Sequence, residues 1–221
     1  MQESGMVLTK QKIYKKVYDT ACSDLRNSDQ EERFVAAGLT CTTTETGLVA
    51  YIPYFDEIIS FAIPGFTFKS SKGVNITLTA KIVLLHYILR ASGVPLGGDK
   101  IPYEDIQGLR HYYPVFERRV LKPLQSAFGY NRQAFLDAGL SLGGQKEEFG
   151  DGSFTLRALP RVPITFILWE GDEEFPPSLR TLFDPSITGY LPLEDIVVIS
   201  KLASTRILKE ARSLSMKGIM E

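Results

Sequence analysis

Cysteine is scarce in this chain, which has only two in 221 residues. Cys22 and Cys41 form no Cys-x-x-Cys pair, so by themselves they cannot hold an iron–sulfur cluster or a cysteine-rich zinc site. We expect two reduced thiols, at least one of them buried. A redox disulfide is the alternative, and a reducing compartment disfavours it.

Neither sign of charge is in excess, and no apolar run is long. The chain has 25 Lys and Arg against 26 Asp and Glu, a net charge of −1, so no basic surplus attracts nucleic acid or anionic lipid. The apolar run 82–85 is broken at His86, far short of a membrane span. The N-terminus lacks a basic-then-apolar signal. These absences predict a cytoplasmic protein with no membrane or nucleic-acid partner, and they leave the oligomeric state open.

Common catalytic and nucleotide-binding motifs are also missing. The sequence has no Gly-x-x-x-x-Gly-Lys-Ser/Thr loop, no Gly-x-Gly-x-x-Gly after a strand, and neither His-x-x-x-His nor His-Glu-x-x-His, which disfavours nucleotide binding by the common loops. Residues 139–143 do match the Gly-x-Ser-x-Gly pattern of hydrolases, but that motif needs a strand before the serine and a histidine after it. His86 and His111 both precede Ser141, so we interpret the match as chance.

The composition, 44% hydrophobic and 23% charged, is that of a globular protein with a sizeable core. Periodicity and capping residues predict helices, strands, helices, strands and a final helix, in that order. The strands come in adjacent pairs, which favours an α+β fold over a doubly wound parallel sheet. The main predicted helices span 7–22, 76–92, 114–128 and 192–214, and the predicted strands span 48–54, 58–68, 153–159 and 163–169.

We therefore predict one α+β domain over residues 1–221. An antiparallel or mixed sheet, built from strand pairs, packs against a central buried helix and a long C-terminal helix. The Gly-rich segment 143–152 is the weakest point of the chain. A division into two lobes, or a mobile lid, would fall at this flexible seam.

The central helix, 76–92, is apolar nearly all round, which is typical of a buried helix. At about 100° per residue, its polar exceptions Thr79, His86 and Arg90 fall on one narrow stripe. A histidine there can bind a metal or a cofactor, or carry a proton, although a core histidine satisfied by one hydrogen bond is more common. We single out His86, with Arg90 and Thr79, as candidate cofactor-binding residues.

Aromatic side chains crowd the predicted strand pair 48–68. They are Tyr51, Tyr54, Phe55, Phe61, Phe66 and Phe68. They could fill a two-sided core, or they could line an apolar pocket for a flat ligand, with a histidine as the polar anchor. Tyr54 is a candidate contact in that pocket, and Trp169, the only tryptophan, would lie at its rim.

An acidic loop follows the predicted strand 163–169. Glu170, Asp172, Glu173 and Glu174 place four carboxylates in five positions, and such crowding needs a cation, an arginine or open water. Asp172, Glu173 and Glu174 are candidate ligands of a hard metal ion, and the loop could also supply a general base. The alternative is a solvated turn, or one tied down by an arginine. The arginines that could do so are Arg157, Arg161 and Arg180.

Four motifs in the second half of the chain are recognisable. They are Ala158-Leu159-Pro160, Gly171-Asp172-Glu173-Glu174-Phe175-Pro176, Leu182-Phe183-Asp184 and Tyr190-Leu191-Pro192-Leu193-Glu194-Asp195. They resemble an uncharacterised family, a domain of unknown function in anaerobic bacteria and methanogenic archaea, and the resemblance would cover most of the chain. Some relatives carry an added four-Cys iron–sulfur module like those of corrinoid proteins, which this chain lacks. The resemblance implies anaerobic redox or corrinoid-linked metabolism, and it supplies no catalytic residues.

The leading hypothesis is a binding or accessory protein for a bulky, apolar ligand, cobalamin or another tetrapyrrole, with His86 as its axial or polar contact. A first alternative is a metal- or carboxylate-dependent enzyme that uses the acidic loop 170–174. A second is a protein-interaction module that docks a redox protein through Phe175, Pro176 and Pro177. The sequence leaves open whether the protein is an enzyme.

Overall fold

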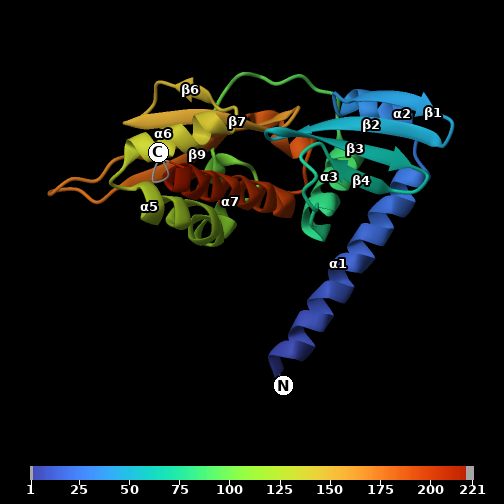
Figure 1. Ribbon diagram of the computed structural model, residues 1–221, viewed down its shortest axis with the longest axis horizontal. Coiled ribbons are helices and arrows are strands. Elements are labelled where there is room, and N and C mark those ends of the chain that lie inside the picture. Colours follow the sequence, from blue (N-terminus) through green and yellow to red (C-terminus); the bar gives the residue numbers. More distant parts are fainter. Residues whose placement is uncertain (1, 218–221) are drawn as a thin grey trace. The chain divides into compact units, whose positions relative to one another are not determined.

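The structure is a computed structural model that describes the backbone of residues 2–217 and the side chains of residues 11–217. The predicted α+β class is confirmed, because helices accompany two sheets of antiparallel strands (Figure 1). The chain folds into two compact units whose segments interleave along the sequence. Unit 1 comprises Met1–Pro53, Glu57–Val94 and Gly189–Pro192, and unit 2 comprises Tyr54–Asp56, Pro95–Thr188 and Leu193–Glu221.

Unit 1 holds a four-stranded sheet with its helices. The strands follow chain order, β1 (Thr40–Thr44), β2 (Gly47–Tyr54), β3 (Glu57–Ile63) and β4 (Thr67–Ser70), and the helices are α1 (Gln2–Arg26), α2 (Gln30–Ala36) and α3 (Leu78–Arg90). The prediction of a single strand over 58–68 is wrong. This segment is broken into β3 and β4 around Pro64, which cannot donate a ladder hydrogen bond.

The central buried helix predicted from the sequence is α3. Most of its side chains are buried, and these are Ala80, Ile82, Val83, Leu84, Leu85, Tyr87 and Ile88. The sequence predicts Asn75 as the cap of this helix, but the cap is Thr77 and α3 therefore begins later than predicted. Thr77 Oγ1 accepts a hydrogen bond from the amide of Ala80 at 3.2 Å. The Tyr87 hydroxyl donates to the carbonyl of Ala37 at 2.6 Å, which ties α3 to the end of α2.

Unit 2 holds a five-stranded antiparallel sheet in the order β5-β9-β8-β7-β6. Its strands are β5 (Ile101–Pro102), β6 (Gln145–Glu147), β7 (Gly152–Leu159), β8 (Val162–Trp169) and β9 (Ser178–Phe183). Its helices are α4 (Tyr113–Phe116), the π-helical turn η3 (Glu117–Leu121), α5 (Lys122–Phe128), α6 (Arg132–Ser141) and α7 (Leu193–Lys217). β7 and β8 form the predicted pair. Residues 143–152, the predicted seam, lie inside this unit and include β6.

Close packing of α6 on β7 explains a helix end that the sequence misplaces. The sequence predicts a short helix that Asn131 caps and Gly139 ends. Asn131 Oδ1 does accept the amide of Ala134 at 2.9 Å, but α6 continues to Ser141. A Cβ at Gly139 would lie 2.3 Å from Cε1 of Phe154. The glycine is therefore needed where the helix meets an aromatic ring, not where the helix stops.

The helices predicted over 114–128 and 192–214 are present in altered form. The helix predicted over 114–128 is divided into α4, η3 and α5, and Pro123, which lacks the amide for an α-helical bond to Arg119, follows the π-helical turn. The C-terminal helix, α7, extends a few residues beyond its predicted end.

Within residues 2–217, no helix combines the length and the apolar character that crossing a membrane requires.

Candidate functional site: a histidine groove and an acidic loop

A groove between α1 and α3 in unit 1 contains His86. Its volume is about 230 Å³, and its lining residues are Lys16, Val17, Thr20, Ala21 and Asp24 from α1, with His86 and Leu89 from α3. The sequence predicts a pocket between the sheet and this helix, whereas no strand residue lines the groove. The two helices pack on each other, so the half-buried His86 lies at their junction.

The groove combines apolar walls with a few polar groups. Three of its seven lining residues are apolar, and the others supply an ammonium, a hydroxyl, a carboxylate and the imidazole of His86. Such a mixture is usual in small-molecule sites, where apolar walls give burial and polar groups fix orientation. The imidazole already interacts with its surroundings. A histidine that is held through one ring nitrogen can still bind a metal through the other.

The other four predicted cofactor contacts do not line this groove. Thr79, half-buried, and Arg90, exposed, are both on α3, while Tyr54 and Trp169 belong to unit 2. Tyr54 is only 3% exposed, and the guanidinium of Arg206 lies 4.8 Å from its ring centroid. Trp169, at the end of β8, is 39% exposed. His86 is therefore the one predicted contact that lines the groove.

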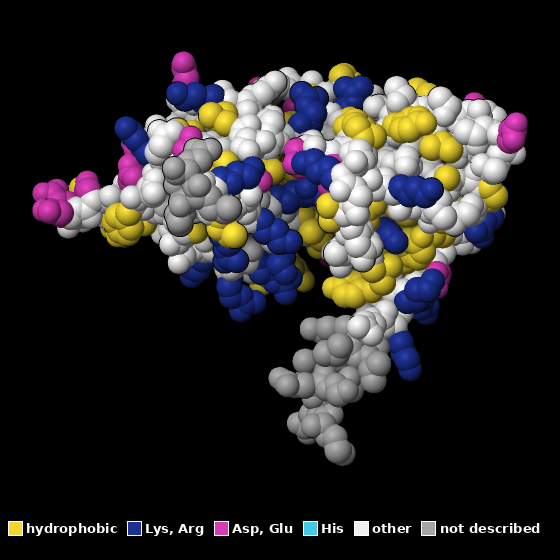
Figure 2. Space-filling view, in the orientation of Figure 1, with side chains coloured by type: hydrophobic (Ala, Val, Ile, Leu, Met, Phe, Trp, Pro, Cys, Tyr) yellow, Lys and Arg dark blue, Asp and Glu magenta, His cyan; other side chains and the backbone are white. Residues whose placement is uncertain are grey.

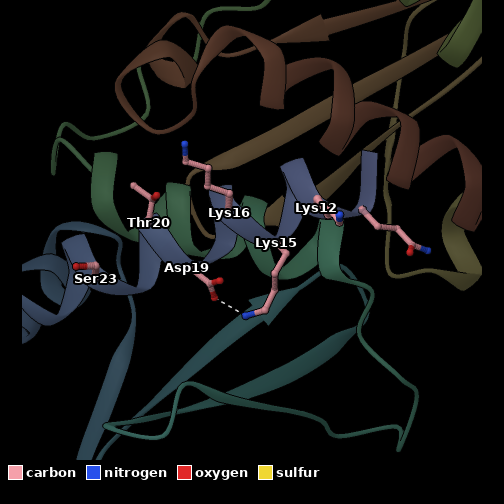
Figure 3. Close-up of a pocket in the computed structure, with 7 residues that line it drawn as sticks. Lys12, Lys15, Lys16, Asp19, Thr20 and Ser23 are labelled. Atoms are coloured by element: carbon pink, nitrogen blue, oxygen red, sulfur yellow. Dashed lines mark hydrogen bonds and ion pairs between the residues drawn. The ribbon is translucent and has the colours of Figure 1, made fainter. Parts of the chain in front are cut away.

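A wider hollow of about 680 Å³ runs along α1. Figure 3 shows residues of this helix that line it, with Lys12, Lys15, Lys16, Asp19, Thr20 and Ser23 labelled. The lining residues within 11–217 are all exposed and belong to α1, and Lys15 pairs with Asp19 one turn along the helix. Among the residues whose side chains the structure describes, one helix supplies the lining, so they form no opposing wall that could enclose a ligand.

The acidic loop is held by its own backbone and by α6. The Asp172 carboxylate accepts hydrogen bonds from the amides of Phe175 at 2.7 Å and Glu174 at 2.8 Å, and these bonds hold the pKa of Asp172 below its usual value. Glu170 Oε1 accepts the amide of Arg132 at 3.0 Å, at the start of α6. Within residues 11–217, no three or more His, Cys, Asp and Glu side chains are grouped so that they could hold a metal ion.

An arginine that the sequence does not single out lies beside this loop. Arg132 Nε is 3.9 Å from Glu170 Oε2, whereas Arg180, one of the expected partners, pairs with Glu104 at 3.5 Å. Glu173 and Glu174 are exposed. Next to them the ring of Phe175 is 67% exposed, so the end of the loop presents charge and apolar surface together.

The Gly-x-Ser-x-Gly match lies at a helix end. Ser141 is the last residue of α6 and donates a hydrogen bond to Glu210 Oε1 at 2.7 Å. The strand that a nucleophile elbow requires before its serine is not present there. The interpretation of this pattern as a chance match therefore agrees with the local structure.

Asp184 is a buried carboxylate whose contacts the sequence does not reveal. It is 5% exposed and accepts the amide of Gly98 at 3.0 Å, and the amide and hydroxyl of Ser186 at 2.9 and 2.6 Å. Burial alone would raise its pKa, but the bonds from Ser186, Gly98 and Gly97 outweigh burial and hold the pKa below its usual value. In the sequence, only the run Asp-Pro-Ser after a strand points to this residue, because such a run is typical of a turn that the aspartate side chain stabilises.

A second polar cluster lies on the sheet of unit 2. Lys100 Nζ is 2.5 Å from Glu147 Oε1, and the Thr155 hydroxyl donates to the same oxygen at 2.6 Å. The hydroxyls of Thr155 and Thr165 are 2.7 Å apart on paired positions of β7 and β8. Burial opposes ionisation of Glu147, but the bonds from Lys100 and Thr155 lower its pKa overall. This arrangement is a stable ion pair whose carboxylate remains charged at neutral pH.

Comparison with protein families decides where the chain belongs. Residues 29–206 match the family model DUF3786, described as a domain of unknown function. The chain belongs to the DUF3786 family. The predicted resemblance to an uncharacterised family is thereby confirmed. The DUF3786 match includes α3 with His86 and the acidic loop, while the α1 wall of the groove precedes it. No curated protein and no solved structure matches the chain.

Proposed function

We propose that this DUF3786 protein is a binding or accessory protein that takes its ligand at the groove between α1 and α3. The observation that carries the proposal is the half-buried imidazole of His86 among apolar walls. In such a groove the apolar walls bury the part of the ligand that enters, and the polar groups select and orient it. Among the predicted contact residues, His86 is the one that such a ligand would reach.

We propose a corrinoid or another tetrapyrrole as the ligand class, with His86 as the axial contact. The imidazole fits the metal of such a ring. The volume does not fit the ring itself, because about 230 Å³ is below the roughly 300 to 1,000 Å³ of ordinary ligand pockets. Binding would therefore leave most of the macrocycle outside the groove, with contact concentrated at the imidazole.

We place this role in the cytoplasm, with a small molecule or a redox protein as partner and without nucleic acid. The net charge of −1 supports the last point, since it gives the chain no overall attraction for a polyanion. Cys22 and Cys41 are both free thiols, which suits a reducing compartment.

An anaerobic UV-visible titration with cobalamin and with haem tests the proposal. Wild type should give a saturable shift of the absorption bands. His86→Ala should weaken binding by at least about tenfold, the equivalent of about 1.4 kcal/mol, because it removes the metal contact. His111→Ala is the matched control, since it removes the other histidine at an exposed position of unit 2, and it should bind as wild type does.

Two results would contradict this function. A shift that persists unchanged in His86→Ala would mean that the ligand binds away from the groove. The absence of any shift with either compound in wild type would remove the tetrapyrrole as the ligand class.

A further inference from the structure

Six Lys and Arg side chains gather on one face of unit 2, which we call the cationic face. They are Arg118, Arg119, Lys122, Lys201, Lys209 and Arg212, and all six are exposed. Three come from η3 and the start of α5, and three come from α7. Figure 2 shows dark-blue side chains grouped along α7 and over the segment below it.

Helix geometry and packing bring these charges together. Lys201, Lys209 and Arg212 are spaced at i, i+8 and i+11, which places them within an arc of about 80° on one side of α7. α7 packs against η3, where the hydroxyl of Ser204 donates to the carbonyl of Val120 at 3.2 Å. This buried bond holds α7 against η3, so the two sets of exposed side chains belong to neighbouring elements.

The cationic face is poorly neutralised. Lys122 pairs with Glu117 at 3.5 Å, and none of the other five forms an ion pair with a residue that the structure describes. Adjacent like charges repel, which lowers the stability of the fold. In a chain with a net charge of only −1, this concentration of cations indicates a surface that meets an anionic partner.

The acidic loop of the same unit has the complementary charge. Asp172, Glu173 and Glu174 are exposed at its end beside the ring of Phe175. Figure 2 shows this magenta end standing away from the rest of the unit. A partner surface would therefore meet three carboxylates and an aromatic ring together, the combination of charge and apolar anchor that protein interfaces use.

The base of the acidic loop is fixed before any partner arrives. The amide of Gly171 donates to the carbonyl of Gly129 at 2.8 Å. A Cβ at Gly171 would lie 2.6 Å from both Pro177 Cδ and Tyr130 Cε1, so backbone, proline and ring are in close contact. A rigid loop loses little conformational freedom on binding, and this favours docking as a preformed element.

We propose that the cationic face is a self-association surface whose occupant is the acidic loop of a second copy of this chain. Each copy carries both elements, so the pairing can be reciprocal and can close a two-fold dimer. The acidic loop supplies three exposed carboxylates of the opposite charge, which favours this loop as the occupant. Self-association of this kind is independent of any ligand at His86.

Sedimentation velocity on the full chain tests the proposal. Wild type should be a dimer at about 0.1 M salt and a monomer at about 1 M, because the screening length falls from about 10 Å to about 3 Å. The double variant Glu173→Lys/Glu174→Lys reverses the loop, and Lys209→Glu/Arg212→Glu reverses part of the face. Each alone should weaken the dimer by at least about tenfold. An equimolar mixture should dimerise again, since each reversed element then meets its opposite charge.

Other results would overturn the proposal. A wild-type monomer at about 100 µM and low salt excludes useful self-association, and a dimer that persists in both double variants uses another surface. If wild type is monomeric but binds polyglutamate or a DNA duplex, and Lys209→Glu/Arg212→Glu abolishes that binding, the occupant is another anion. Circular dichroism verifies that each variant is folded. If a charge-reversed variant does not fold, the neutral double variant Glu173→Gln/Glu174→Gln replaces it, and this variant should also weaken the dimer.

Discussion

At the residue scale, Asp184 shows how one buried carboxylate organises a distant segment. Its oxygens accept amides and a hydroxyl from Ser186, next along the chain, and from Gly98, 86 positions earlier. Gly98 has a positive φ of 84°, a conformation that glycine adopts without strain. The carboxylate therefore ties the loop that contains Gly98 to the end of β9.

We predict that Asp184→Asn lowers the free energy of unfolding by about 2 to 3 kcal/mol near neutral pH, because hydrogen bonds to a buried charge are weakened. The folded-state pKa of Asp184 is lowered, so its contribution is complete above the unfolded pKa and is lost as pH falls through the folded pKa. Urea unfolding at about pH 7 and about pH 3 should show the difference between wild type and variant shrinking in acid.

The control for this prediction is Asp172→Asn. Asp172 also accepts two amides, but it is exposed and ties only its own loop. The Asp172→Asn variant should therefore unfold at the same urea midpoint as wild type. If Asp184→Asn lowered the free energy of unfolding equally at both pH values, the loss would come from altered side-chain packing and not from the lost charge.

Residue patterns predict position better than they predict contact. Helical spacing correctly places His86 on a polar stripe of a buried helix, because spacing depends only on the helix. It does not reveal that α1 faces His86 across a groove, since that depends on a segment about 65 residues earlier. The partners of Asp184 are hidden for the same reason.

At the scale of elements, α6 and β7 pack so closely that a glycine is required between them. The ring of Phe154, which Gly139 touches, also lies 4.7 Å from the ring centroid of Phe135 and 5.7 Å from that of Phe166. These neighbouring rings restrict the movement of the Phe154 ring. Gly139 therefore acts through packing, although glycine within a helix is otherwise unfavourable.

We predict that Gly139→Ala destabilises the protein by about 1 to 2 kcal/mol. Alanine gains about 1 kcal/mol of helix propensity, but overpacking in a filled core costs about 1 to 3 kcal/mol, and the approach of 2.3 Å to Phe154 points to the upper part of that range. Chemical denaturation measures the net effect. Adding Phe154→Leu to the variant should recover part of the loss.

Gly97→Ala is the matched control, because a Cβ at Gly97 would meet nothing within 4 Å. It should be neutral to within about 0.5 kcal/mol. If both variants lost the same free energy of unfolding, or if Gly139→Ala were more stable than wild type, the glycine would not be a packing requirement. The Phe154 ring would then move aside to admit the methyl group.

Elements with strong periodicity are predicted, and short ones are not. α3, α7, β7 and β8 follow from apolar spacing that their own residues carry. β1 is a run of mostly exposed Thr and Cys residues, and β9 is six residues long and follows two prolines. Both are strands because a neighbouring strand supplies hydrogen bonds, which is information outside the segment itself.

At the scale of the whole molecule, the units are assembled from separated stretches of chain. The short segment Gly189–Pro192 belongs to unit 1, although nearly a hundred residues separate it from the rest. There the carbonyl of Gly189 accepts the amide of Ser92 at 3.0 Å, and the ring of Tyr190 stacks on Tyr87 at 5.8 Å. Such a division cannot be read from composition, because the deciding contacts join residues that no local pattern connects.

We predict that residues 1–94, expressed alone, are markedly less stable than unit 1 is in the full chain. The fragment lacks Tyr190, which is fully buried and donates a hydrogen bond to the carbonyl of Val94. Losing a buried aromatic side chain costs about 3 kcal/mol or more, a large part of the stability of a small domain. Circular dichroism during thermal unfolding compares the fragment with the full chain.

Tyr190→Ala in the full chain separates this cause from simple truncation. Because Tyr190 packs within unit 1, the variant should speed amide hydrogen exchange in α3 more than in β7 and β8 of unit 2. A fragment as stable as unit 1 in the full chain would mean that residues 1–94 fold without the returning segment. Equal acceleration in both units would mean instead that they unfold as one cooperative body, so that a contact deep in either unit stabilises the whole chain.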